Sequence, residues 1–443
     1  MKQLRTLGLL VLVLGGLLAY LYFVDAEKPV GEAEAKPKVF GVEADQIDAL
    51  KISTIAGGDA ELAKNADGWA LTAPQALKAD DAEVSGITSS LASVTVERVV
   101  DENPSDPGQY GLKEPAVEVS FRVKGSKDFK TLQLGGKSPT GSDMYAKTAD
   151  SPKVFMVYAH LESSFNRTPF DLRDKKILSF DRDKVDRIEV RRGPELLTFI
   201  KANGEWRATT PVEARGDFGA IEGLLSRLQS TQMRAIVEES AADLKQYGLE
   251  PAAIEVTVSA GSARAGLAIG TKDAEGQLRV RDIARTQVVA VPGDLLTDFE
   301  KAASDFRRKD VFDFRAFNVD TLEITRDGAA VVFERLKGKG KDGADAWRNA
   351  TANKELDAAK FEPFVTKLSG LRAQSFAAAA DKTGLDTPSL AVKATFDEGK
   401  KNETVRIGRV GTDAFAGRAD EPGAAKLDGA ALDEILKELD TFK

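Results

Sequence analysis

Apolar residues alternate with polar ones over many short stretches of the chain, which is the period of a half-buried β-strand. Three of these stretches share one spacing of apolar positions, namely Ile47, Leu50 and Ile52, then Val185, Ile188 and Val190, then Val319, Leu322 and Ile324. Other stretches carry apolar residues near i, i+3, i+4 and i+7, the period of an amphipathic helix. These helical stretches begin at Val84, Ile221 and Phe361. The pattern therefore predicts one set of strands and helices that occurs three times in the same order.

Each predicted repeat contains one tryptophan. Trp69, Trp206 and Trp347 are the chain's only tryptophans and lie 137 and 141 residues apart. An indole face can stack on a sugar, so a glycan contact is one interpretation. The regular spacing favours the other interpretation, in which each indole packs in the core of its repeat.

Two glycine landmarks follow the helix in each repeat. The first is a glycine within a Tyr-Gly-Leu motif, or Thr-Gly-Leu in the third repeat, and occurs as Tyr110-Gly111, Tyr247-Gly248 and Thr383-Gly384. A strand is expected to open after each motif. A second strand is expected to end at Gly135, Gly270 and Gly408. Glycine at a strand end suits a turn that needs positive φ.

Two of the three junctions carry a further shared segment, at residues 169–174 and 304–310. Each holds an arginine among carboxylates, Arg173 in the first and Arg307 in the second. We expect charge-assisted hydrogen bonds from these guanidinium groups to lock one repeat onto the next. Binding of an anionic ligand is the alternative.

These landmarks predict an α+β chain of three tandem repeats. Each repeat is expected to be a mostly antiparallel sheet of six or seven short strands with two helices on one face. The expected boundaries are 39–181, 182–314 and 315–443. At roughly 130 residues, a repeat can bury a core of its own.

The N-terminus predicts a membrane anchor. Lys2 and Arg5 lie in a short tail, residues 1–5, before an uncharged run at residues 6–24. A helix of that length spans about 28 Å, close to the thickness of a bilayer's hydrocarbon core. The positive tail predicts a cytoplasmic N-terminus and a periplasmic body in the inner membrane of a bacterium, with 25–38 as linker. Bulky residues at the end of the run favour an uncleaved anchor, although the sequence leaves cleavage open.

The composition of the chain disfavours or excludes several kinds of partner and active site. The net charge is −8, which disfavours a nucleic-acid partner. The chain has no cysteine and one histidine, His160. Because the chain has no cysteine, it cannot use a thiolate nucleophile. A zinc site is not expected, because cysteine and histidine are its usual ligands. No cofactor is expected either.

The motifs resemble a bacterial family called domain of unknown function 4340. The resemblance rests on the Tyr-Gly-Leu motif with its following Pro115, on the run from Leu134 through Gly141, and on the segment from Phe170 to Lys175. It covers nearly the whole chain beyond the linker and is weakest in the third repeat, where Thr383 replaces the tyrosine. It implies a protein with one N-terminal anchor and ABC-type transporter components as partners. The family name implies no biochemical activity.

Few residues suggest catalysis. The segment 135–141 has Gly, Lys and Ser in sequence, but Pro139 is incompatible with the helix that a phosphate loop requires, so a hairpin turn is expected. His160 is expected to be structural or exposed, and no nucleophile elbow surrounds Ser163 or Ser164. A non-enzymatic binding or scaffold protein is therefore the favoured hypothesis. A hydrolase or carbohydrate-active enzyme using a carboxylate pair such as Asp143 and Asp150 is the alternative.

Overall fold

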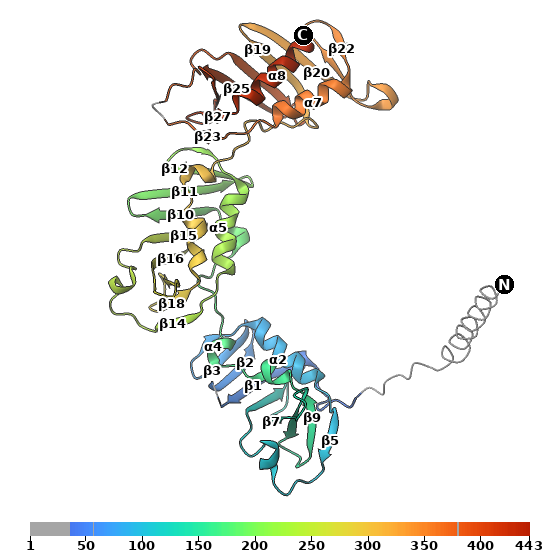
Figure 1. Cartoon of the computed structure of the whole chain (residues 1–443), viewed down its shortest axis with the longest axis vertical. Helices are drawn as coiled ribbons and strands as arrows, with labels where there is room; N and C mark the ends of the chain where they lie inside the picture. The colour runs from blue at the N-terminus through green and yellow to red at the C-terminus, as the bar shows by residue number, and fades with distance from the viewer. Residues whose placement is uncertain (1–35, 56, 379–380) are drawn as a thin grey trace, which may run out of the picture. The chain divides into compact units, whose positions relative to one another are not determined.

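The computed structural model describes residues 36–55, 57–378 and 381–443 (Figure 1). The predicted tail and anchor, residues 1–24, lie outside these ranges, as does the linker before Lys36. Within the described ranges, no helix is long and apolar enough to cross a membrane. The chain forms two compact units, one that ends at Lys175 and one from Lys176 to Lys443.

The first unit contains one nine-stranded antiparallel sheet, in the order β4-β3-β2-β1-β6-β7-β8-β9-β5. Its strands are β1 (Ile47–Thr54), β2 (Gly58–Asn65), β3 (Gly68–Ala73), β4 (Leu77–Lys78), β5 (Arg98–Asp101), β6 (Val117–Val123), β7 (Phe129–Lys137), β8 (Asp143–Thr148) and β9 (Val154–Tyr158). Its helices are α2 (Asp81–Ser93), α3 (Leu161–Phe165) and α4 (Pro169–Leu172).

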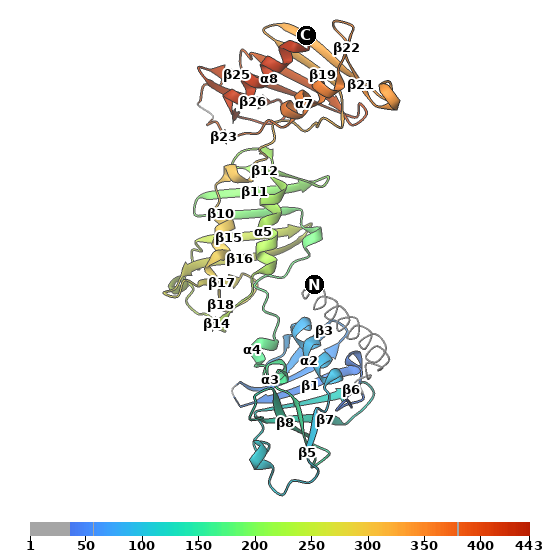
Figure 2. The same ribbon diagram turned by 45° about the vertical axis from the view of Figure 1, so that its right-hand side comes forward.

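The second unit contains two more sheets of nine strands (Figure 2). The first has the order β13-β12-β11-β10-β15-β16-β17-β18-β14. Its strands are β10 (Arg187–Arg192), β11 (Glu195–Ala202), β12 (Glu205–Thr210), β13 (Ala214–Arg215), β14 (Ala235–Glu238), β15 (Ile254–Ala260), β16 (Ala263–Lys272), β17 (Leu278–Asp282) and β18 (Val288–Val291). Its helices are α5 (Phe218–Ser230) and α6 (Leu296–Phe299).

The last sheet has the order β22-β21-β20-β19-β24-β25-β26-β27-β23. Its strands are β19 (Val319–Arg326), β20 (Ala329–Leu336), β21 (Ala346–Asn349), β22 (Lys354–Leu356), β23 (Ser375–Phe376), β24 (Leu390–Phe396), β25 (Lys401–Val410), β26 (Asp413–Arg418) and β27 (Ala425–Leu427). Its helices are α7 (Ala358–Ser369) and α8 (Gly429–Thr441). The three sheets share one strand order, so the chain is α+β with three repeats.

Nine strands per sheet exceed the six or seven expected. The additional strands lie at or near the sheet edges, and several of them, such as β4 and β13, contain only two residues. A two-residue strand is too short to show an alternating pattern, because alternation needs at least four residues to be recognised.

An aspartate caps the N-terminus of the first long helix in each repeat, which is α2, α5 or α7. The carboxylates of Asp80, Asp217 and Asp357 each accept a hydrogen bond from a backbone N–H in the first turn of the helix. This satisfies donors that otherwise have no partner within the helix. Each helix then buries its apolar side chains in the core of its own repeat, as Ile221 and Leu224 of α5 show. The predicted amphipathic period is therefore confirmed.

The three tryptophans are core residues. Trp69, Trp206 and Trp347 are 5%, 2% and 0% exposed, which leaves no indole face open to a sugar. In the second repeat the indole N–H of Trp206 donates to Glu222 at 2.9 Å. In the third, the guanidinium of Arg335 lies 4.7 Å from the ring centroid of Trp347. The glycan-stacking interpretation of the tryptophans is wrong.

The glycines at 135, 270 and 408 do not end their strands. Each lies within a strand, in β7, β16 or β25, and none is among the residues with positive φ. A Cβ at Gly270 would lie 2.0 Å from the carbonyl oxygen of Tyr247. A Cβ at Gly408 would lie 2.4 Å from the carbonyl oxygen of Thr383. Glycine is needed here for the close approach of the Tyr-Gly-Leu turn, rather than for a turn of its own.

Candidate functional site

The Tyr-Gly-Leu turn closes against the second strand after it, which is β7, β16 or β25. Gly111, Gly248 and Gly384 have φ values of 70°, 65° and 69°, the left-handed region that favours glycine. The hydroxyl of Tyr247 donates to Glu238 at 2.9 Å. This hydrogen bond, together with burial, raises the pKa of Tyr247. The motif is thus an architectural element of the repeat.

The junction arginines lie at equivalent positions of the first and second repeats. Arg173 is 7% exposed and forms a bridge with Ala79, at the end of β4. Arg307 forms the equivalent bridge with Gly216, and its guanidinium lies 3.8 Å from the ring centroid of Phe376. Burial lowers the pKa of Arg307. Arg307 therefore contacts the third repeat through the ring of Phe376, while the charge of Glu421 in the same repeat partly opposes the effect of burial on its pKa.

Carboxylates do join the second and third repeats, but through a different arginine. Arg215, at the end of β13, is 8% exposed. Its Nη1 donates to Asp313 at 2.6 Å, and its Nε donates to Glu421 of the third repeat. Its Nη2 donates to the carbonyl oxygen of Asp310 at 2.8 Å. Sequence analysis missed Arg215, because nothing in its local pattern marks it as part of a junction.

Arg418 of β26 completes this junction network. It donates to Asp313 at 3.0 Å, to Asp420 at 3.0 Å and to Glu403. Glu403 is 5% exposed and also accepts from the backbone N–H groups of Asp313 and Phe314 at 2.8 to 3.0 Å. Every charge in this cluster faces an opposite charge, as buried ions require.

The same cluster controls the ionisation of Asp313. Burial alone would raise the pKa of this carboxyl, but the guanidinium groups of Arg215, Arg418 and Arg308 lower it below the ordinary value. Asp313 is therefore charged near neutral pH. The network is arranged to hold two repeats together, and each of its arginines is satisfied by protein groups.

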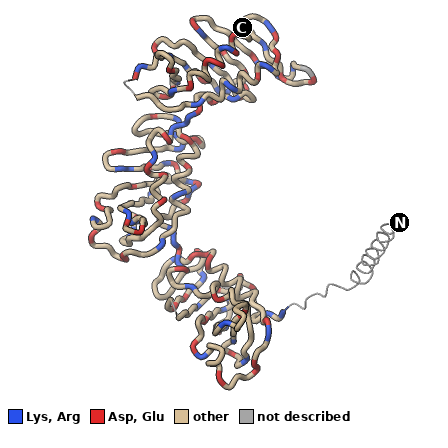
Figure 3. The backbone as a smooth tube through the Cα atoms, viewed as in Figure 1, with Lys and Arg blue, Asp and Glu red and all other residues tan. Residues whose placement is uncertain are grey.

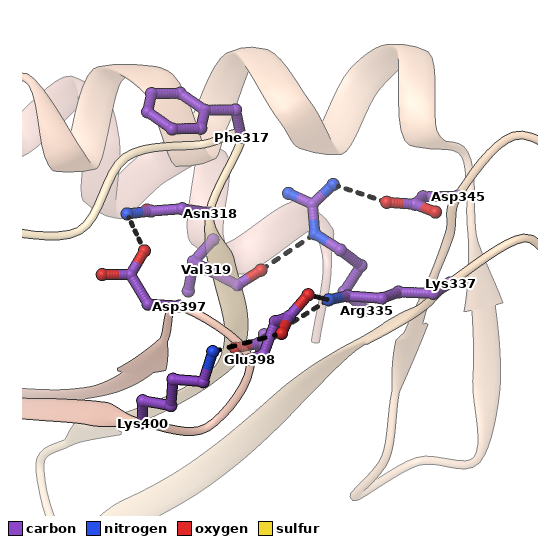
Figure 4. Close-up of a pocket in the computed structure, with 10 residues that line it drawn as sticks. Phe317, Asn318, Val319, Arg335, Lys337, Asp345, Asp397, Glu398 and Lys400 are labelled. Atoms are coloured by element: carbon purple, nitrogen blue, oxygen red, sulfur yellow. Dashed lines mark hydrogen bonds and ion pairs between the residues drawn. The ribbon is translucent and has the colours of Figure 1, made fainter.

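A hollow of about 440 Å³ lies next to this network in the third repeat. Figure 4 shows Phe317 above a floor formed by Arg335 and by the hairpin residues Asp397, Glu398 and Lys400. Asn318 Nδ2 donates to Asp397 at 2.9 Å. Lys337 lies 3.7 Å from Glu398, and Lys400 lies 3.5 Å from it. These two pairs are long and exposed, so they contribute little energy and can exchange partners.

Two carboxylates of the hollow, Asp345 and Asp397, are not prepared for proton transfer. Hydrogen bonds from the Gly338 N–H and from Arg335 lower the pKa of Asp345. The ion pair with Lys401 lowers the pKa of Asp397. Both groups are ionised near neutral pH, whereas a general acid at that pH needs a raised pKa.

Phe317 is the most distinctive residue of the hollow. Its side chain is 81% exposed, more than any other large hydrophobic side chain in the described residues. Phe317 lies two residues before Val319, and the residues two before the equivalent Ile47 and Val185 are Asp45 and Asp183. Both aspartates are exposed. The fold therefore accepts a charged residue here, and packing does not explain the phenylalanine of the third repeat.

A second hollow of about 520 Å³ adjoins the first and shares Asn318, Asp397 and Lys400 with it. It continues to Asp313 and Arg418 of the junction network. The two hollows make one polar surface with Phe317 at one end, and we call this the Phe317 surface. Lys and Arg are interspersed with Asp and Glu along all three repeats (Figure 3).

The other candidate residues do not come together. Asp143 and Asp150 lie at opposite ends of β8, so about 15 Å or more separates them, and they cannot act as one carboxylate pair. His160 is exposed, precedes α3 and stacks on Tyr158 with ring centroids 5.8 Å apart. Residues 135–137 belong to β7, and the turn after them leads into β8, as the expected hairpin requires. Among the described residues, no three His, Asp or Glu side chains are grouped as metal ligands.

Comparison with known proteins identifies a family for this chain. Neither the curated proteins nor the solved structures include a match to this chain. The model of a family described as domain of unknown function (DUF4340) matches residues 69–205 and 206–388. Each matched segment begins at a tryptophan of the repeat, so its limits fall inside the sheets. The two segments cover most of the chain, and this chain therefore belongs to the DUF4340 family.

Proposed function

We propose that this chain is a membrane-anchored, extracytoplasmic binding protein that docks onto components of an ABC-type transport system. The exposed Phe317 carries this proposal. An aromatic side chain that the fold does not need, surrounded by charges that already have partners, is the composition of a protein contact site. The resemblance of the motifs to the DUF4340 family supports the choice of partner.

The geometry of the Phe317 surface suits docking better than catalysis. Phe317 can bury its ring against a partner, while Lys337, Glu398 and Lys400 can exchange weak ion pairs for pairs across the interface. The hollows are open and polar, and the pKa values of Asp345 and Asp397 within them are lowered. Residues 6–24 would hold this surface outside the cytoplasm at the inner membrane.

The experiment uses the full chain produced in a bacterium that encodes such a transporter. A photo-crosslinking phenylalanine analogue at position 317 should capture a transporter subunit after illumination. The same analogue at Phe218, which is 57% exposed in the second repeat, is the matched control and should capture much less. Equal capture at both positions, or capture without any transporter subunit, would refute the proposal.

A substitution tests the energetics of the same contact. Phe317→Asp installs the residue that the first and second repeats carry at this position, so folding should be unaffected. We expect recovery of the transporter in mild detergent to fall about tenfold or more, the effect of losing an interface hot spot. Phe218→Asp should leave recovery unchanged. Unchanged recovery with Phe317→Asp would remove Phe317 from the interface.

A further inference from the structure

The first and second repeats cover the same sheet edge in the same way. In the first, the Asp80 N–H donates to the carbonyl oxygen of Leu172, and the Asp174 N–H donates to that of Lys78, both at 2.8 Å. In the second, the Asp217 N–H donates to Phe306 and the Arg308 N–H donates to Arg215, again at 2.8 Å. The junction segment of each repeat thus forms a short antiparallel bridge beside β4 or β13.

The third repeat has the same edge. Leu356 of β22 pairs with Trp347, just as the N–H groups of Ala79 and Gly216 donate to Trp69 and Trp206. Asp357 then caps α7, as Asp80 and Asp217 cap their helices. The outward-facing groups of this edge are consequently the carbonyl of Glu355 and the N–H of Asp357. Within the described residues, neither group has a hydrogen-bond partner.

The third repeat also differs from the second in its last helix. In the second repeat, α6 ends at Phe299, and an extended segment later follows Phe306 along β13. In the third repeat, α8 continues to Thr441, and the carbonyl oxygen of Phe442 accepts from Asn349 Nδ2 at 3.0 Å instead.

The apolar space beneath the edge is already filled in the third repeat. Phe306 packs on Phe199 in the second repeat, with ring centroids 5.0 Å apart. In the third, Phe361 of α7 lies 4.8 Å from Phe333, the equivalent strand residue. A segment that pairs with β22 therefore needs to supply main-chain groups but no apolar anchor.

We infer that the outer edge of β22 is a docking edge, which takes an extended segment of a partner protein as one more antiparallel strand. β22 is the outermost strand of its sheet (Figure 2). Unpaired strand edges are templates for strand addition, and the other two repeats show which hydrogen bonds this edge makes when it is occupied. The partner segment must offer a carbonyl to Asp357 and, two residues later, an N–H to Glu355. This docking edge is distinct from the Phe317 surface.

The experiment adds a labelled synthetic peptide to the full chain. The peptide has the sequence of residues 302–309 with Phe306→Ser, because Phe361 already fills the space that Phe306 takes in the second repeat. We expect fluorescence anisotropy to show saturable binding, and hydrogen exchange at Asp357 to slow when the peptide binds. The control peptide carries Arg308→Pro, which removes the N–H that Arg215 accepts in the second repeat. It should bind about tenfold more weakly, the effect of one main-chain hydrogen bond.

A matched pair of protein variants isolates the Asp357 N–H. The φ of Asp357 is −69°, which proline can adopt, so Asp357→Pro removes this N–H without backbone strain. Asp357→Ala loses the same helix cap but keeps the N–H. Asp357→Ala should bind the peptide as the unmodified chain does, whereas Asp357→Pro should lose about tenfold in affinity.

Three results would overturn the inference. The first is equal affinity for the two peptides and the two variants. The second is no binding at peptide concentrations of about 1 mM. The third is a dimer of the full chain that is lost in Asp357→Pro, because a second copy would then occupy the edge. Peptide binding that survives in Phe317→Asp would separate this edge from the proposed transporter contact.

Discussion

Glu403 is the residue whose loss should most weaken the third repeat and its junction. In Glu403→Ala, the backbone N–H groups of Asp313 and Phe314 lose their acceptor, and Arg418 loses one of its carboxylates. An unsatisfied buried donor costs about 1–3 kcal/mol, and breaking a buried ion pair costs about 3–5 kcal/mol. These costs overlap, since Arg418 keeps Asp313 and Asp420 as partners. We expect the free energy of unfolding of the third repeat to fall by about 4 kcal/mol.

The assay is urea unfolding of the full chain, followed by hydrogen exchange in β24 and β25. These strands report on the third repeat separately from the other two. A domain of this size has a urea dependence of about 2 kcal/mol per molar, so the midpoint should fall by about 2 M. Glu403→Gln keeps an acceptor oxygen for the backbone and should lose about half as much.

The control is Glu323→Ala, in the same sheet. The side chain of Glu323 is 43% exposed, and its oxygen lies 3.9 Å from Lys393, so its loss should cost less than about 0.5 kcal/mol. If Glu403→Ala shifts the midpoint no more than this control does, the network does not stabilise the repeat, and the reasoning from burial fails.

Two further predictions concern the junction and the glycines. The pKa of Asp313 is lowered in the folded chain, so its contribution to stability is complete above the ordinary value of 3.8 and is lost as pH falls through the lower, folded pKa. Urea midpoints of the third repeat should therefore drop in acid, and more steeply than in Asp313→Asn; parallel curves would contradict this. Gly270→Ala should cost about 3 kcal/mol of unfolding free energy, because the new methyl would meet the Tyr247 carbonyl. Gly223→Ala lies in α5, where the new methyl has open space, and should instead raise the free energy of unfolding by about 0.5–1 kcal/mol. Thermal melting should show a lower melting temperature for Gly270→Ala and a higher one for Gly223→Ala.

The sequence determined the repeat itself. Hydrophobic periodicity, the spacing of the tryptophans and the Tyr-Gly-Leu motif were sufficient for an α+β fold in three copies, because each copy must bury the same face of the same elements. The interpretation of the tryptophans as core residues was confirmed for the same reason. Short edge strands were missed, since two residues such as those of β13 carry no period.

Only the tertiary structure showed why Gly270 must be a glycine and which charged groups pair across the junction. Gly270 is a glycine because a carbonyl from another turn approaches it, and no local pattern contains that neighbour. Arg215 binds Glu421, which lies 206 residues later in the sequence, in the loop after β26. The predicted Arg307 instead contacts the ring of Phe376. The exposure of Phe317 is also a tertiary property, because an isolated phenylalanine in a sequence looks the same whether it lies in a core or on a surface.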